Sequence, residues 1–362
     1  NLIFSAKDKD SKNSKLKTGI KRNVGPLLLK RMFFVTERLD AITKCQNLLE
    51  SEGTAYVIGT GGSYPVAAFI SIVLNRHGKL FSQPMHPFNY IRIGSLSNYV
   101  IVVSYSGSTP DCGAVIRKAL SMGVRNVVLL TGSGNPKLKN LLQQNDNNVI
   151  SYRTPVRSAK DITIEPPKER GFISFAGTVS PCTLWVSAVV GSVEMANLAG
   201  ELNEFYNMAD PIPNIAELGK LIKEKPGETV SVLGGGFAWP AMLDIESKFV
   251  EGDLGNVMLH EVKDFSHGRF MSLLGNDNKS PIIVLGVGPW HEYEQLVLKT
   301  VEQGRLIISI RSIFNDILGS LELLVKVQFF ARWLGEYFNK DISRPKPPRA
   351  GIKLYKWKGQ LE

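Results

Sequence analysis

The sequence predicts an α/β protein whose parallel sheets are covered by helices on both faces. Short apolar segments, such as residues 99–103, alternate with longer segments in which apolar residues recur at helical spacing. A glycine-rich loop at 59–63 and a hydroxyl-rich loop at 104–109 each follow an apolar segment. Because parallel sheets bind ligands at the carboxyl ends of their strands, both loops are candidates for a binding site.

Length and charge limit the classes of protein to consider. The 362 residues are enough for two domains, and a hydrophobic fraction of 43% is typical of a globular protein. The net charge of +10 is partly local, because basic residues crowd positions 1–25 and again 341–362. We expect the first stretch to be a flexible basic arm. Neither stretch has the interleaved aromatic residues of a nucleic-acid surface, so nucleic-acid binding is the less favoured interpretation.

Cysteines and apolar runs indicate the compartment. Three cysteines at irregular spacing predict neither a disulfide framework nor a zinc site, and they favour the cytoplasm. The lysine-rich start shows no signal-peptide pattern. Residues 171–193 carry no charge and are long enough to span a bilayer, but Pro181 interrupts them. We therefore predict a buried helix there and no membrane association.

Strands and helices are expected to alternate from residue 26 to residue 130. Apolar residues at helical spacing predict a long amphipathic helix over 26–52. A strand at 55–58, the glycine loop and a helix at 65–77 follow. The last elements are a strand at 99–103, a helix that ends near Met122, and a strand at 126–130. This alternation predicts a parallel sheet.

The second half repeats the pattern. Residues 56–65 and 231–240 both run from an apolar segment through glycines and an aromatic residue to a proline, at an offset of 175 (240 − 65). Further strands are expected at 281–285 and 306–310. Residues 286–289 follow the first of these and hold no hydroxyl group. The sequence thus predicts a duplicated fold with one phosphate site per chain, in the first half.

That site is predicted at residues 104–109, which read Ser-Tyr-Ser-Gly-Ser-Thr and precede Pro110. A helix N-terminus offers unpaired N–H groups and partial positive charge, and short hydroxyl side chains can surround a phosphate. The loop is neither a dinucleotide fingerprint nor a P-loop. The alternative is an ordinary strand-to-helix turn with serine and threonine caps.

Together these features resemble the sugar isomerase (SIS) domain family. The chain is most similar to the isomerase module of glutamine–fructose-6-phosphate aminotransferase and to stand-alone phosphosugar deaminases and fructosamine-phosphate deglycases. The resemblance implies two tandem SIS domains, each a parallel sheet flanked by helices in a flavodoxin-like three-layer sandwich. We place the first domain at 26–205, the second at 206–340 with a linker near 210–213 close to its start, and a tail at 341–362 that closes on the site.

The resemblance also implies a set of residues that hold the phosphate and the sugar. They match the family's Ser-x-Ser-Gly-x-Thr loop, with a tyrosine where many members have glutamine, its Gly-Thr-Ser-Tyr loop, its Glu-x-Gly-x-x-Ser segment and its helical lysine. The set comprises Ser104, Tyr105, Ser106, Thr109, Ser63, Ser174 and Lys248.

Three further residues match the family's catalytic positions. Glu251 ends a segment similar to Glu-x-x-x-Lys-x-x-Glu, with Asp244 in first place, and this spacing puts the side chains on one helix face. His267 lies 16 positions later (267 − 251), and Lys353 ends a segment similar to Pro-Arg-x-x-x-Lys. The resemblance implies a proton-shuttling base, a ring-opening histidine and an imine-forming lysine.

Each assignment has an alternative. Glu251 can be an ion-paired surface residue, His267 a structural histidine, and Lys353 one more cation of a basic tail. Lys248 can be only the partner of the aspartate four positions earlier, and Tyr105 can pack on a neighbouring loop. No metal is predicted, because histidines, cysteines and carboxylates never fall at ligand spacing, and no cofactor is needed for acid–base chemistry on a phosphate-anchored sugar.

The sequence therefore predicts an enzyme that acts on a hexose 6-phosphate, or on its amino or fructosamine derivative, by aldose–ketose isomerisation, with deamination or deglycation as an added step. Asp264 and Arg269 replace the family's usual glutamate and proline, which leaves the exact substrate open. The resemblance implies a homodimer, or a dimer of dimers, with the histidine supplied by the partner subunit. The alternatives are a non-catalytic sugar-phosphate sensor and a scaffold whose basic arms bind nucleic acid.

Overall fold

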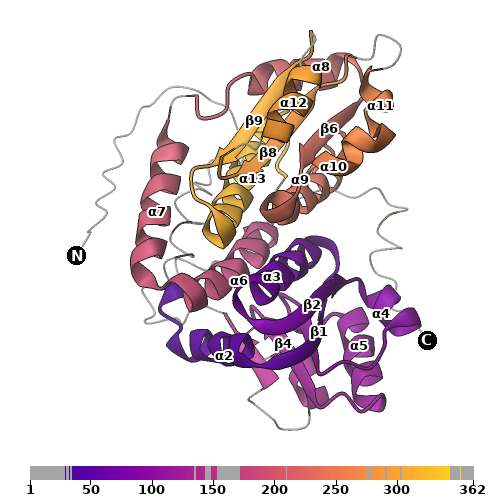
Figure 1. Cartoon of the computed structure of the whole chain (residues 1–362), viewed down its shortest axis with the longest axis vertical. Coiled ribbons are helices and arrows are strands. Elements are labelled where there is room, and N and C mark those ends of the chain that lie inside the picture. The colour runs from indigo at the N-terminus through magenta and orange to yellow at the C-terminus, as the bar shows by residue number, and fades with distance from the viewer. Residues whose placement is uncertain are drawn as a thin grey trace.

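The computed structural model confirms an α/β fold with two parallel sheets (Figure 1). One sheet belongs to the first half of the chain and the other to the second half, and they lie toward opposite ends of the long axis with helices between them. The structure describes residues 29, 32, 35–133, 136–142, 148–152, 172–208, 210–274, 279–289, 292–301, 304–342 and 351. The expected basic arm at 1–25 and most of the tail therefore lie outside the described residues.

The first sheet has the strand order β2-β1-β3-β4-β5, and all four pairings are parallel. This is the flavodoxin-like order that the sequence led us to expect. Neither of its outer strands was predicted from the sequence: β2 buries only alternate residues and contains Pro84, and β5 has only 3 residues. The strands are β1 Glu52–Ile58, β2 Lys79–Met85, β3 Tyr99–Val103, β4 Asn126–Thr131 and β5 Val149–Ser151.

Helices cover both faces of this sheet. One deviation concerns the long helix predicted over 26–52, which is interrupted by a turn at Glu37 and Arg38 and ends at Glu50. Arg38 has φ −86° and ψ 68°, outside the helical region, and its side chain pairs with Asp40 at the start of α2. The helices are α2 Leu39–Glu50, η1 Gly61–Ser63, α3 Tyr64–His77, α4 Pro87–Ile93, α5 Pro110–Ser121, η2 Lys137–Leu142, α6 Phe172–Val190 and α7 Ser192–Asn207.

The second sheet has the order β7-β6-β8-β9 and is also parallel throughout. Its outer strand β7 was likewise not predicted. The strands are β6 Thr229–Gly234, β7 Asn256–Glu261, β8 Ile282–Val287 and β9 Ile307–Ser312. The helices are α8 Ile215–Glu224, η5 Gly236–Ala238, α9 Trp239–Glu251, α10 Val262–Asp264, the π turn η6 Phe265–Arg269, α11 Met271–Leu274, α12 Glu292–Val301 and α13 Asp316–Tyr337.

The predicted duplication is confirmed in backbone detail. In each half the first strand of the repeat leads through a one-turn 3₁₀ helix into a long helix, as β1–η1–α3 and as β6–η5–α9. The 3₁₀ turns begin at Gly61 and Gly236, with φ of 52° and 54°. This left-handed conformation favours glycine at both positions, which explains the repeated glycine run.

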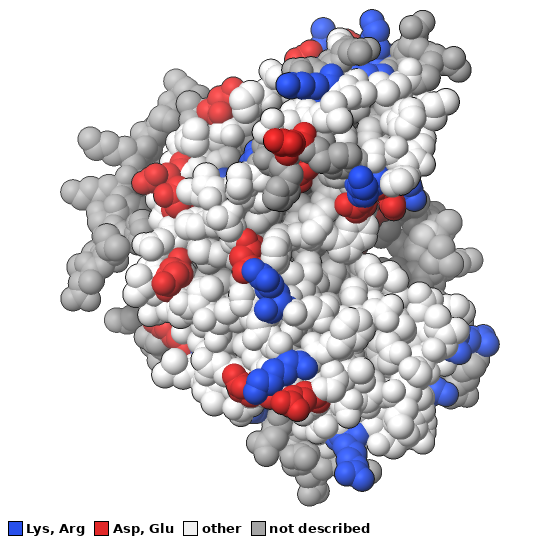
Figure 2. All heavy atoms as spheres, in the orientation of Figure 1, with Lys and Arg blue, Asp and Glu red and all other residues white. Residues whose placement is uncertain are grey.

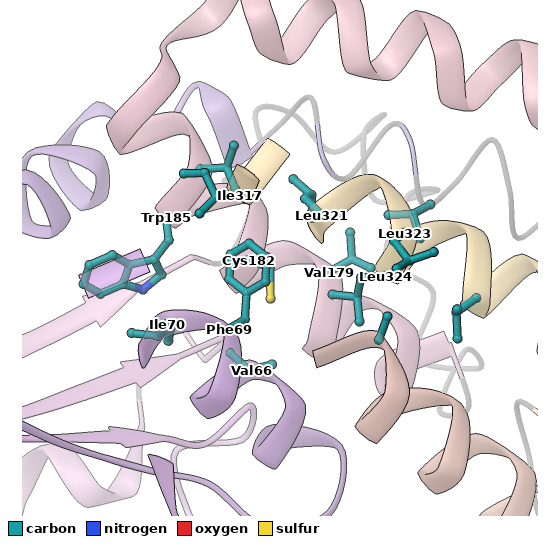
Figure 3. Close-up of a cluster of buried hydrophobic side chains, with 14 of the residues drawn as sticks. Val66, Phe69, Ile70, Val179, Cys182, Trp185, Ile317, Leu321, Leu323 and Leu324 are labelled. Carbon is teal, nitrogen blue, oxygen red and sulfur yellow. The ribbon is translucent and has the colours of Figure 1, made fainter. Parts of the chain in front are cut away.

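One hydrophobic core joins the two halves (Figure 3). Val66, Phe69 and Ile70 of α3 face α6, whose Trp185 is fully buried, and α13 of the second half closes the cluster. Helix α6 thus contributes a buried helix to the core, as predicted for this part of the chain, and Pro181 lies inside it. Within the described ranges, no helix is both long and apolar enough to cross a bilayer.

Candidate functional site

The hydroxyl loop follows β3 and is held rigidly by its own hydrogen bonds. Ser104 is buried, its hydroxyl is hydrogen-bonded to that of Thr109 at 3.1 Å, and its N–H donates to the carbonyl of Leu130. Gly107 has φ 59°, and a Cβ there would lie 2.2 Å from Cβ of Pro136. Only glycine fits at such a position. The loop therefore presents a fixed set of hydroxyls at the N-terminus of α5.

Two hydroxyls of the loop face outward. Ser106 and Ser108 are exposed, and their side-chain oxygens are 3.0 Å apart. Thr109 immediately precedes α5, a helix of 12 residues, and its own side chain makes no cap bond to the helix backbone. The first turn of α5 thus offers N–H groups and the positive end of a helix dipole beside the exposed hydroxyls of Ser106 and Ser108. This arrangement is suited to an anion, as predicted from the sequence.

Tyr105 is a packing residue of this loop. Its ring lies against Gly132 and Gly177, where a Cβ would approach the ring to 2.8 Å and 3.2 Å, and its centroid is 6.3 Å from that of Tyr152. Its carbonyl accepts hydrogen bonds from the N–H of Gly132 and the hydroxyl of Thr131. The structure therefore favours the packing alternative for Tyr105. The hydrogen bonds from the end of β4 to its carbonyl were not predicted from the sequence.

The glycine loop lies beside the hydroxyl loop, because β1 pairs directly with β3. A Cβ on Gly59 would lie 2.2 Å from the carbonyl oxygen of Ser63, so the turn closes tightly on itself. The hydroxyl of Thr178 in α6 donates to the carbonyl of Gly62 at 3.3 Å. Ser63 is half-buried at the end of this turn.

Glu251 brings the second half of the chain to this loop. It is the last residue of α9, it is exposed, and its Oε1 accepts a hydrogen bond from the hydroxyl of Ser247 at 3.2 Å. The same oxygen lies 3.8 Å from the point that a Cβ of Gly61 would occupy. Burial raises the pKa of the neighbouring Glu246, and the charge of Glu251 adds to that rise. A carboxylate is thus placed over the glycine turn.

Lys248 lies one turn earlier in α9 but is buried in the core. Its ammonium is 3.0 Å from Asp244 Oδ1, and the amide of Gln328 donates to Asp244 Oδ2 at 3.0 Å. Asp244 has no exposed side-chain surface, and Lys248 has 4%. The ion-pair alternative for Lys248 therefore has direct support, while its contact with a sugar stays a prediction.

His267 is separated from Glu251 within the chain. It lies in the exposed π turn after β7, at the carboxyl edge of the second sheet, and Gly268 beside it has φ 124°. Helix α9 runs back from that edge for 13 residues, about 20 Å, before it reaches Glu251. The two predicted catalytic residues thus lie near opposite edges of one sheet.

Comparisons with known proteins identify the fold. No protein-family model matches the sequence, and no curated protein matches it. Among solved structures, glucosamine-6-phosphate deaminase from Thermotoga maritima is similar with a TM-score of 0.61 at 16% identity, covering 89% of this chain and 98% of that one. The C-terminal domain of glucosamine-fructose-6-phosphate aminotransferase from Francisella tularensis is similar with a TM-score of 0.58 at 14% identity, covering 88% and 98%. The chain shares the fold of these structures, an α/β fold with two parallel sheets flanked by helices. The fold predicted from the sequence is confirmed.

Within this fold, the structure brings together a large part of the predicted site. Glu251, Ser63 and the hydroxyl loop gather at the carboxyl edge of the first sheet. Ser174 lies in α6, but its side chain is outside the described residues, as is Lys353. In the described part of the chain, no group of histidine, cysteine and acidic residues is arranged to hold a metal ion.

Two aromatic rings at the same edge were not predicted as site residues. Tyr64 begins α3 directly after Ser63, and His86 follows β2. Their rings stack at a centroid distance of 3.7 Å and an angle of 17°. Because strand β2 was not predicted from the sequence, nothing indicated that His86, which follows it, lies beside the glycine loop.

Proposed function

We propose that this chain is a phosphosugar-processing enzyme that moves a proton between carbons 1 and 2 of a hexose 6-phosphate or of an amine-bearing derivative. The observation that carries the proposal is the position of Glu251, whose carboxylate lies over Gly61, one strand away from the hydroxyl loop. An anion loop and a carboxylate at adjacent strand ends fit the two ends of a phosphosugar. The phosphate anchors the ligand, and the carboxylate reaches the carbons at its other end.

In this proposal Ser104, Ser106 and Thr109 hold the phosphate together with the first turn of α5, and Ser63 contacts the sugar. Binding energy from the phosphate orients the reacting carbons without a cofactor. Glu251 then takes the proton from one carbon and returns it to the next, which interconverts aldose and ketose through an enediol or, for an amino sugar, an enolamine. Lys353 is proposed as an additional site residue that can form an imine with the open-chain carbonyl.

A homodimer would complete the site. Since Glu251 and His267 lie at opposite edges of the second sheet in one chain, a second copy is the source of a histidine that reaches the Glu251 site. The imidazole would assist opening of the sugar ring. Two of the similar structures belong to proteins whose names refer to glucosamine and a sugar 6-phosphate, which supports deamination or deglycation as an added step.

Surface charge and cysteines support a cytoplasmic enzyme over the nucleic-acid alternative. On the face shown in Figure 2, the described basic and acidic side chains are interspersed, and they do not gather into one basic patch. Cys45, Cys112 and Cys182 are free and buried. Free thiols of this kind are typical of a reducing compartment.

Deuterium uptake from heavy water tests the proposal. We expect exchange at carbons 1 and 2 of fructose 6-phosphate, glucosamine 6-phosphate or a fructosamine 6-phosphate, followed by NMR. Glu251→Gln should slow this exchange by about 100-fold or more, because it removes the base and keeps the shape. Glu217→Gln, an exposed change on α8, is the matched control and should leave the exchange unaltered.

Two results would contradict this function. If no exchange occurs although a phosphosugar binds, the chain is a sugar-phosphate sensor and no enzyme of this type. If Glu251→Gln and the wild type exchange equally fast, the base is another group.

A further inference from the structure

The stacked rings of Tyr64 and His86 occupy a defined place at the carboxyl edge of the first sheet. Strands β2, β1 and β3 are neighbours in that order, and their ends carry His86, the glycine turn and the hydroxyl loop respectively. Adjacent strands are about 4.8 Å apart, so His86 and the hydroxyl loop start roughly 10 Å from each other. The glycine turn, with Glu251 over it, lies between them.

His86 is held in one orientation. Its ring is hydrogen-bonded to the backbone of Gly59, and it is stacked on Tyr64 at 3.7 Å. That hydrogen bond raises the pKa of His86, which indicates that the ring N–H donates and the Gly59 carbonyl accepts. Burial has the larger effect, and it lowers the pKa of His86. In the neutral ring the nitrogen that does not donate carries a lone pair and is a hydrogen-bond acceptor. The side chain is only partly covered and is exposed overall, so a ligand at this edge has access to it.

The order of the three loops gives a ligand a direction. A phosphosugar with its phosphate at the hydroxyl loop and carbons 1 and 2 beside Glu251 extends along the edge from β3 toward β1. Any group attached to the reacting end in the same direction next meets the end of β2. That end presents the stacked rings of Tyr64 and His86.

We propose that Tyr64 and His86 form the subsite for a nitrogen-borne substituent at the reacting end of the phosphosugar, with His86 accepting a hydrogen bond from its N–H group. The ligand class is a hexose 6-phosphate that carries an amine substituent, in preference to the unsubstituted sugar. This inference rests on the proposed function, because it assumes that the phosphate and the reacting carbons lie as described above.

Calorimetric titration of wild-type and variant full-length chain tests the subsite with two ligands, fructose 6-phosphate and a fructosamine 6-phosphate derived from an amino acid. His86→Phe keeps a ring for the stack and removes the acceptor. It should weaken binding of the fructosamine 6-phosphate by about tenfold, the effect of one hydrogen bond to a charged donor, and change fructose 6-phosphate binding by less than about twofold. His86→Gln restores a donor and an acceptor without the ring and should recover part of the loss.

Control variants separate this role from a structural one. His77→Phe changes a histidine at the other end of α3, where it pairs with Asp316, and should affect neither ligand selectively. If His86→Phe weakens both ligands equally, the ring pair only supports the glycine loop and the subsite is refuted. If the wild type binds neither ligand, the proposed function fails instead, so the two failures are distinguishable.

Discussion

At the scale of single residues, the buried ion pair of α9 lies on the same helix face as Glu251, the proposed base. Asp244, Lys248 and Glu251 share one helix face, but only Glu251 is exposed at the site. A buried charge needs a partner, since an unpaired one costs several kcal/mol. The spacing that suggested a set of pocket residues therefore also fits a buried ion pair next to an exposed carboxylate.

We expect Lys248→Met to lower the free energy of unfolding by about 3 kcal/mol, because it leaves the Asp244 carboxylate buried without its ammonium partner, while the amide of Gln328 still donates to it. Lys220→Met is the matched control, since Lys220 pairs with Glu224 at the same spacing but on the surface, and it should cost less than about 0.5 kcal/mol. Denaturant unfolding measures both changes. Equal effects of the two variants would show that the buried pair contributes nothing to stability.

At the scale of elements, the hydroxyl loop depends on one backbone conformation. Gly107→Ala should weaken phosphosugar binding by about tenfold or more, because a Cβ at φ 59° would also collide with Pro136 and displace the serines. Gly123→Ala introduces a similar positive φ, 81°, where nothing lies within 4 Å, and should lower stability without changing the affinity. Titration with fructose 6-phosphate compares the two. A Gly107→Ala chain with unchanged affinity would place the anion elsewhere.

The elements also show what the sequence could and could not predict. The central strand β3 is apolar on both faces and has the bounds predicted from the sequence, although β1 begins three residues before its predicted start. By contrast, β2 and β7 are outer strands that bury one face only. The turn at Glu37 was missed because the helical apolar spacing continues across it. Because β2 was not foreseen, the place of His86 beside the glycine loop was not foreseen either.

At the scale of the whole molecule, the site is assembled from parts that are distant in the sequence. Motif matching placed Glu251 and Ser63 in one site, but only packing of α9 and α6 against η1 shows how they meet. Composition and periodicity carry no information on such long-range contacts. The same packing puts His267 at the far edge of the second sheet, which within one chain keeps it away from Glu251.

Subunit complementation tests whether two copies share one site. We expect Glu251→Gln and His267→Asn each to be nearly inactive alone, and a re-equilibrated equal mixture to recover about a quarter of wild-type exchange, since half of the dimers are mixed and each holds one intact site of two. Mixing Glu251→Gln with the double variant should recover nothing, because no Glu251 is then present. If mixed dimers form and activity stays absent, each chain must supply both groups to its own site, and α9 would have to bring its carboxylate across about 20 Å. Recovery would instead make the second copy part of the catalytic unit, and activity would then fall with dilution as the dimer dissociates.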